Sequence, residues 1–161
     1  LAESNPELMP TWRAFAAEVI GTAVLLMVIL GTTDPYNRDR PQILTAATIG
    51  LTVTLLICLM GPLTMACFNP ARDLGPRLFS SLAGWKLIPF TANGTGWLTV
   101  YIVAPILGGL LGGAIYRAFF HGNYRAHHHA IIREESHKPA GAGLGHEVDG
   151  ERRTPEPARS R

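Results

Sequence analysis

Three residues near the middle of the chain, Asn69, Pro70 and Arg72, have types and a spacing that could line a pore. Proline is accepted at the first position of a helix, where its missing N–H needs no partner, and asparagine is a good N-cap before it. Arginine stays charged, supplies several donors and repels cations, so at membrane depth it can bind a neutral solute while it excludes ions. The plainer alternative is a structural role, in which the arginine binds backbone carbonyl oxygens of a loop and only holds that loop in place.

The helix that begins at Pro70 must be short. Gly84 and Pro89 follow, so the spacing predicts an end near Ser81, and at about 1.5 Å per residue such a helix is too short to cross a bilayer. Irregular backbone at membrane depth must line a water-filled cavity or be buried in protein, so residues 61–68 are expected to offer carbonyl oxygens to a pore. A surface loop followed by an interfacial helix is the alternative on these residues alone.

Glu18 is a carboxylate inside an otherwise apolar segment. An ionisable group in a membrane crossing is expensive unless it is paired or hydrogen-bonded, which makes it a candidate functional residue. A proton relay is the competing hypothesis, but no second ionisable partner lies in the apolar segments. We therefore favour a supporting role for this carboxylate.

Three apolar stretches surround these residues: Ala14 to Thr33, Ile43 to Cys67 and Leu98 to Tyr116. Each approaches or exceeds the roughly 20 residues that span the hydrocarbon of a bilayer. A soluble three-helix bundle would need polar outer faces, and the stretches show little polar periodicity of a helical kind. The sequence therefore predicts an all-α membrane protein with three transmembrane helices plus a re-entrant half-helix.

Several function classes are disfavoured by composition. The net charge of +2 is small and argues against a nucleic-acid partner, and Cys58 and Cys67 in apolar surroundings argue against a disulfide framework or a cysteine zinc site. A solvated polar run is favoured over a metal site for residues 127–129, which are three histidines. No catalytic constellation is visible, so we expect neither an enzyme nor a cofactor. No signal peptide is predicted, and the start at Leu1 fits a chain cut from something longer.

The chain resembles the second half of the major intrinsic proteins, the aquaporins and aquaglyceroporins. The resemblance covers roughly Trp12 to Phe120 and is carried by Gly61-Pro62-Leu63-Thr64, Asn69-Pro70-Ala71-Arg72-Asp73-Leu74-Gly75-Pro76-Arg77, Ala83-Gly84-Trp85, Ala17-Glu18-Val19-Ile20-Gly21-Thr22, Gly108 through Gly113 and Tyr116-Arg117. The family builds its pore from two inverted repeats, each with an Asn-Pro-Ala half-helix. This chain contains one such motif, Asn69, Pro70 and Ala71, so the resemblance implies that the first repeat is missing.

The resemblance implies roles for several of these residues. Arg72 corresponds to the arginine of the selectivity filter, and Asn69 to the asparagine whose amide donates into the pore, where the positive end of the half-helix opposes cations. Glu18 corresponds to a glutamate that accepts hydrogen bonds from the re-entrant loop. It is then expected to orient the carbonyls near Met65, Ala66 and Cys67 toward the solute.

The residues at the expected filter positions favour, but do not fully match, the glycerol-facilitator branch. Asp73 and Arg77 resemble that branch. Ala66 stands where glycerol facilitators have an aromatic residue. Ile57 stands where glycerol facilitators have a glycine and where water channels have a histidine. Residues 101–102, Tyr-Ile, match neither branch. The resemblance therefore implies an atypical filter for glycerol, another small uncharged molecule, or water as well.

Loop charges predict the topology of the chain. The connection Asp34 to Pro41 carries two arginines, and the segment after Phe120 is rich in basic residues, so both are expected on the cytoplasmic side of the cell membrane. We predict a polar outer linker over residues 1–12, the aquaporin-like repeat over 13–120, and a disordered cytoplasmic tail over 121–161. The glycine pairs at 108–109 and 112–113 predict close helix packing, within one protomer on the plainer interpretation. The family resemblance implies a homotetramer.

Two function hypotheses follow. The first is a multi-pass membrane channel that conducts glycerol or similar neutral solutes passively, with the lipid bilayer and the solute as its partners. The second is a non-conducting truncated or split half-channel that needs a separate first repeat. One half-helix cannot complete the pore, so the chain is expected to be a fragment or to work with a separately encoded first half.

Overall fold

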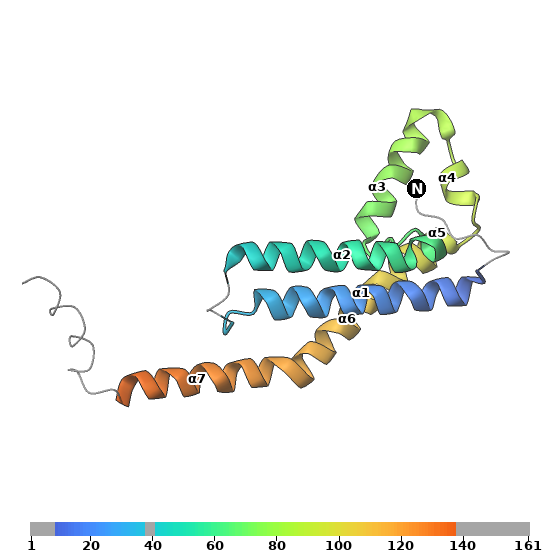
Figure 1. Ribbon diagram of the computed structural model, residues 1–161. Helices are drawn as coiled ribbons and strands as arrows, with labels where there is room; N and C mark the ends of the chain where they lie inside the picture. The colour runs from blue at the N-terminus through green and yellow to red at the C-terminus, as the bar shows by residue number, and fades with distance from the viewer. Residues whose placement is uncertain (1–8, 38–40, 138–161) are drawn as a thin grey trace, which may run out of the picture.

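The computed structural model describes residues 9–37 and 41–137. Two long helices, α1 (Thr11–Thr33) and α2 (Gln42–Thr64), lie side by side as an antiparallel hairpin (Figure 1). Both of them, and the helical stretch Gly96–Glu134, are long and apolar enough to cross a membrane. No strand occurs within the described ranges. The predicted fold class, with three crossings and only helices, is confirmed.

A short helix rises from the end of this hairpin. Residues 65–69 are irregular and lead into α3 (Pro70–Ser80), whose 11 residues span about 16 Å, roughly half the hydrocarbon thickness. A π-helical turn, η1 (Ser81–Trp85), follows, and the chain returns through α4 (Ile88–Thr91), so that α3 and α4 form a wedge that projects from the hairpin (Figure 1). The predicted half-helix and its start at Pro70 are confirmed.

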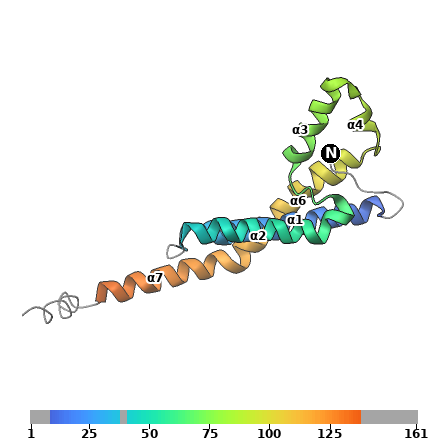
Figure 2. The ribbon, with the colours of Figure 1, turned by 45° about the horizontal axis from the view of Figure 1, so that its top comes forward.

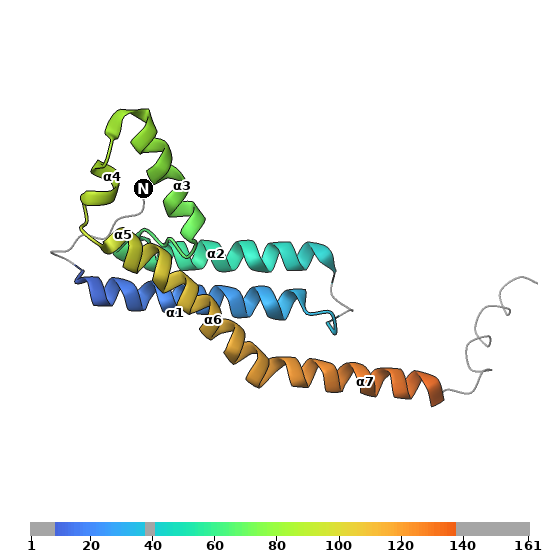
Figure 3. The same cartoon turned by 180° about the vertical axis from the view of Figure 1, so that it is seen from behind.

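The last crossing is one continuous helical path with two π-helical turns. Its elements in order are α5 (Gly96–Leu98), η2 (Thr99–Val103), α6 (Ala104–Tyr116), η3 (Arg117–His121) and α7 (Gly122–His137). α6 passes across α1, and α7 continues beyond the end of the hairpin (Figures 1 and 3). η2, which follows the wedge in the chain, contacts α3, which begins soon after the end of α2.

Two glycines of α6 allow its close approach to α1. A Cβ on Gly108 would lie 2.5 Å from the Val19 carbonyl oxygen, and a Cβ on Gly112 would lie 2.4 Å from the Ala23 carbonyl oxygen. Neither space holds a methyl group, so only glycine lets the two backbones meet here. The predicted role of this glycine-rich segment in packing within one chain is confirmed.

The predicted disorder of residues 121–161 is wrong for Gly122–His137, which form α7 (Figure 2). The physical reason is propagation: once a long helix has formed, each added residue gains a hydrogen bond without the cost of a new nucleus. Rings of η3 and α7 also pack on the loop after α1, with Tyr36 5.7 Å from His121 and 5.5 Å from His128 between ring centroids. Residues 138–161 and most of the predicted linker 1–12 lie outside the described residues.

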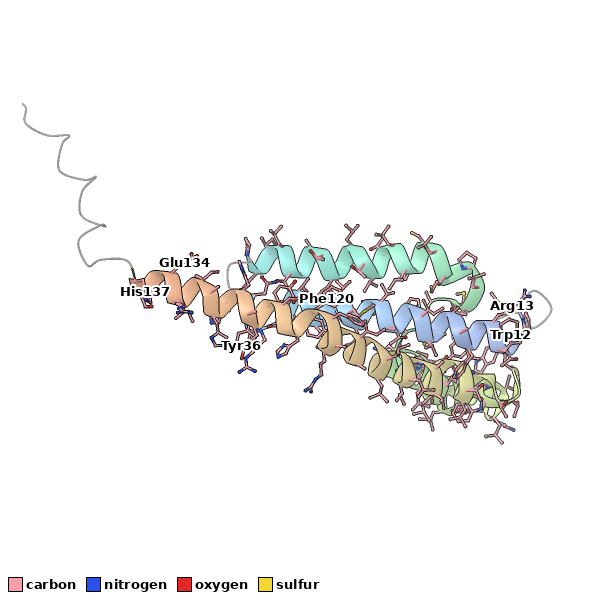
Figure 4. All side chains as sticks on the ribbon, turned by 90° about the horizontal axis from the view of Figure 1, so that it is seen from below. Trp12, Arg13, Tyr36, Phe120, Glu134 and His137 are labelled. Carbon is pink, nitrogen blue, oxygen red and sulfur yellow. The ribbon has the colours of Figure 1, made fainter. Side chains whose placement is uncertain are left out.

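α2 contacts little of the rest of the chain. Only 6% of its apolar window is buried, against 33% for α1. Its large exposed apolar side chains are Ile43, Leu44, Leu51, Leu55, Ile57, Leu59 and Leu63. Figure 4 shows the chain from below, with Trp12 and Arg13 at one end and Glu134 and His137 at the other. The hairpin therefore presents an apolar face that lipid or another protein can cover.

Candidate pore-lining site

The segment between α2 and α3 has an unusual backbone. Met65 (φ 62°), Ala66 (φ 49°) and Phe68 (φ 51°) all adopt the left-handed region, which residues with a Cβ rarely occupy. Each such residue costs on the order of 1–3 kcal/mol and persists only where its surroundings hold it. Three of the four residues 65–68 carry this strain, so the segment requires specific support from its surroundings.

Glu18 provides that support from α1. Its Oε1 accepts a hydrogen bond from the Cys67 N–H at 2.9 Å, and its Oε2 accepts one from the Phe68 N–H at 2.7 Å. The carboxylate is fully buried, and hydrogen bonds to a buried charge are stronger than those between neutral groups. These are the hydrogen bonds expected for Glu18 from the resemblance.

Gly21 is a supporting residue that the sequence analysis did not single out. It lies one helical turn after Glu18, and a Cβ there would lie 2.2 Å from Cε1 of Phe68. The Phe68 ring therefore packs directly on the backbone of α1. Phe68 is buried with Leu56 and Ala66, so the strained segment is held by packing as well as by hydrogen bonds. The signal in the sequence was a glycine three residues after a buried carboxylate.

Asn69 and Arg72 begin α3. The Asn69 Oδ1 accepts a hydrogen bond from the Ala71 N–H at 2.9 Å, which confirms the predicted N-cap. Arg72 turns back over the strained segment, and its Nη1 donates to the carbonyl oxygens of Ala66 at 2.6 Å and Met65 at 3.2 Å. Both Asn69 and Arg72 remain exposed. A guanidinium and a helix N-terminus thus lie together on an open surface.

The other predicted site residues divide into exposed and buried ones. The side chains of Met65 and Ile57 are 52% and 44% exposed. Ala66 and Cys67 are buried, so each offers its backbone rather than its side chain to the site. Asp73 is fully buried and pairs with Arg77, 2.5 Å from Oδ2 to Nε. The structure therefore brings Asn69, Arg72 and the carbonyls together and turns Asp73 away.

A second polar cluster lies at the opposite end of α1. Tyr116 donates to Asp34 Oδ2, the Tyr36 N–H donates to Asp34 Oδ1 at 2.8 Å, and His121 Nδ1 lies 3.1 Å from Oδ2. Burial by itself would raise the pKa of Asp34, but these hydrogen bonds and the nearby His121 lower it below its ordinary value. Sequence analysis missed this cluster, although an Asp-Pro pair after a helix is a turn signal.

A groove of about 390 Å³ lies near that second cluster, and none of the predicted site residues lines it. Its walls come mainly from α1 and from the α6–α7 helix, and include Met27, Tyr116 and Phe120. Within the described ranges, no group of three or more His, Cys, Asp or Glu side chains could hold a metal ion.

Comparison with known proteins identifies the architecture. The family model described as "Major intrinsic protein" matches residues 2–116. The chain belongs to the major intrinsic protein family. It is 40% identical over 116 residues to aquaporin-7 of Rattus norvegicus, a match that covers 72% of this chain and 43% of that protein. It is 38% identical over 104 residues to aquaporin-9 of Homo sapiens, covering 65% of this chain and 35% of the relative.

Among solved structures, the aquaglyceroporin from Plasmodium falciparum matches this major intrinsic protein with a TM-score of 0.69 and 28% identity, over 78% of this chain and 51% of that one. The chain therefore spans about half the length, or less, of the relatives that it matches. Family membership establishes a multi-pass membrane protein of a channel family and not an enzyme family, as predicted.

Proposed function

We propose that this chain forms the half of a passive channel that bears the selectivity arginine, and that the channel conducts glycerol and similar small neutral solutes, with water as a further permeant. The observation that carries the proposal is Arg72, whose guanidinium is fixed on the carbonyls of Met65 and Ala66 beside the N-terminus of α3. The name of one matched structure, the aquaglyceroporin from Plasmodium falciparum, supports the solute class.

The arrangement suits neutral solutes. A fixed cation and the positive end of a half-helix oppose the entry of cations and protons. The remaining donors of Arg72, and the amide NH2 of Asn69, whose oxygen is used by the cap, can bind the hydroxyl oxygens of a polyol. The exposed side chain of Ile57 would supply apolar surface for the carbon backbone of such a solute. Asp73 would act through the placement of α3.

The second half of the pore must come from elsewhere. α3 is the single half-helix in the described part of the chain, Asn69 and Arg72 are open on one side, and α2 leaves its apolar face uncovered. We propose that a first repeat covers this face, and that complete channels assemble as homotetramers. The competing hypothesis is a non-conducting half-channel. When no first repeat is present, the same exposed face of α2 favours this hypothesis.

Stopped-flow light scattering on vesicles that contain this chain alone tests conduction directly, with glycerol and water as the probes. Glycerol entry faster than in empty vesicles, and changed by Arg72→Val, would mean that the chain assembles a pore with itself. Entry no faster than in empty vesicles, with insertion of the protein confirmed, would overturn conduction by this chain alone. A co-expressed first repeat that restored glycerol entry would then support the half-channel.

A further inference from the structure

A buried polar cluster lies on the side of α3 that faces away from the exposed residues Asn69 and Arg72. Asp73, Arg77 and Tyr101 are all fully buried. Arg77 Nε lies 2.5 Å from Asp73 Oδ2, and Arg77 Nη1 donates to the Pro89 carbonyl oxygen. The Arg77 guanidinium carbon also lies 5.7 Å from the centroid of the Tyr101 ring, within cation–π range. One side chain thus connects α3, α4 and the last crossing.

The charges in this cluster depend on each other. Asp73 and Arg77 are one helical turn apart on the same face of α3, and both are removed from solvent. The second carboxylate oxygen of Asp73 is buried and has no hydrogen-bond partner within the described ranges. Removal of Arg77 would therefore leave a buried carboxylate uncompensated, which is more damaging than the loss of a surface ion pair.

The geometry of a helix links this cluster to Arg72. Successive residues of an α-helix are turned by about 100°, so the face that carries Asp73 and Arg77 fixes the rotation of α3 and with it the direction of Arg72. Arg72 must point to Met65 and Ala66, whose carbonyls stand in a strained conformation. A rotation of α3 would separate the guanidinium from both oxygens.

We propose that Arg77 is a positioning residue: together with Asp73, Pro89 and Tyr101 it clamps α3 in the one rotation that holds Arg72 on the re-entrant carbonyls. The consequence for solute selection rests on the proposed function. The mechanical claim does not, because it concerns only how α3 and the re-entrant segment are held. The clamp should therefore be tested by a measurement that needs no conduction.

Cys67 gives such a measurement. It is 2% exposed, and its thiol lies 3.3 Å from the Asn69 carbonyl oxygen, directly before α3. Cys58 is exposed, so the Cys58→Ser background leaves Cys67 as the reporter thiol of the purified full chain in detergent micelles. The rate at which a small maleimide labels Cys67 then reports how often the re-entrant segment opens. Circular dichroism confirms that each variant keeps its helices.

We expect Arg77→Met to raise the labelling rate of Cys67 at least tenfold, and Arg77→Lys, which keeps a charge but not the planar group, to raise it less. The matched control is Asp34→Asn, which changes a buried carboxylate at the other end of α1 and should leave the rate within twofold of the parent. Equal rates for Arg77→Met and the parent would overturn the proposal.

A double-mutant cycle separates positioning from general loosening. Arg72→Gln should also speed the labelling, and combination with Arg77→Met should give less than the product of the two single effects, because both changes release the same contact. A fully multiplicative combination would overturn the link through Arg72. If Arg77→Met does not fold, Asp73→Asn with Arg77→Met removes both buried charges. The proposal then requires faster labelling in that variant too, and parent-like labelling would refute it.

Discussion

At the level of single residues, the site depends on two charged side chains, buried Glu18 and exposed Arg72, that hold a strained backbone segment. Met65, Ala66 and Phe68 have left-handed backbone conformations. These conformations turn the N–H and carbonyl groups of the segment in directions that a regular helix or strand would not allow. Glu18 accepts from two N–H groups of this segment, and Arg72 donates to two of its carbonyls. Opposite charges therefore stabilise the segment from its two sides.

Glu18→Gln should weaken the hold on the re-entrant segment. The amide keeps one acceptor oxygen but places an NH2 group against an N–H donor, and a lost hydrogen bond to a buried charge costs about 2 kcal/mol. We expect a lower melting temperature in detergent, measured by circular dichroism. Glu134→Gln, at an exposed position on α7, is the matched control and should melt like the parent. A parent-like melting temperature for Glu18→Gln would contradict the supporting role.

Gly21→Ala tests the packing of the same segment. Because the added methyl group would overlap the Phe68 ring, the ring must move, and overpacking of this kind costs about 1–3 kcal/mol. Gly50→Ala on α2 is the control, since a Cβ there meets nothing within 4 Å and alanine favours a helix. Thermal unfolding should show a loss of stability for the first variant and none for the second. Two equal melting curves would argue against this contact.

At the element scale, helix faces decide which crossings can approach each other. A Cβ on Gly112 would overlap the backbone of Ala23, whereas a Cβ on the next residue, Gly113, would lie 4.0 Å from the nearest side chains of α1. The sequence pattern of paired glycines predicts closeness but cannot say which member of a pair faces the neighbour. The rotation of α6 relative to α1 decides it.

Gly112→Ala should therefore separate α6 from α1, while Gly113→Ala should be tolerated. The first substitution forces a methyl group to within 2.4 Å of a carbonyl oxygen on a rigid helix, and we expect a loss of stability of about 1–3 kcal/mol. Denaturation of both variants in the same detergent checks the difference. Similar stabilities would mean that the two helices do not meet through Gly112.

The Asp34 cluster ties the loop after α1 to the end of α6 and the end of η3, and it predicts a response to acid. Because the pKa of Asp34 is lowered in the folded chain, its stabilisation is present above the ordinary value of 3.8 and is lost as the pH falls through the lower, folded-state pKa. The groups that face this carboxylate are Tyr116, His121 and Tyr36.

The difference in melting temperature between the parent and Asp34→Asn should thus be constant above about pH 5 and should shrink as the pH is lowered toward 3. Tyr116→Phe removes one hydrogen-bond donor to Asp34, so this difference in melting temperature should begin to shrink at a higher pH. Melting curves recorded across this range for the three proteins test both statements. A difference that grew on acidification would contradict the direction of the pKa shift.

At the scale of the whole molecule, the chain has two unlike ends. The wedge of α3 and α4 lies at one end of the hairpin, and α7 extends beyond the other end (Figures 1 and 2). We propose from the loop charges that the α7 end faces the cytoplasm. A self-assembled pore would need copies inserted in opposite orientations, so orientation bears directly on the proposed function.

A single orientation can be tested with two exposed positions, Ser136 on α7 and Thr95 beside the wedge. With both native cysteines replaced by serine, a membrane-impermeant maleimide should label Ser136→Cys only from the cytoplasmic side of oriented membrane vesicles. It should label Thr95→Cys only from the opposite side. Labelling of each position from both sides would reveal dual topology and would favour self-pairing over a separate first repeat.

Much of the architecture could be predicted from local properties. Uncharged runs predict crossings, because the bilayer excludes unsatisfied polar groups. The Asn69–Pro70 pair predicts the start of α3, because the capping and φ requirements are local. Disorder was predicted for residues 121–161, yet the helix continues through His137. Composition does not report the helix that precedes a segment or the loop on which it packs.

The helices, the half-helix and the residue types that could meet a solute could all be predicted, because each follows from hydropathy, charge and backbone chemistry within a few residues. The side that each residue faces emerges only when the helices pack against each other. This packing turned Arg72 outward onto two carbonyls and buried Asp73 with Arg77, although the two positions are adjacent. The physical reason is that the rotation of α3 is set by contacts with Pro89 and Tyr101, which are distant in the sequence and come together only when the helices pack.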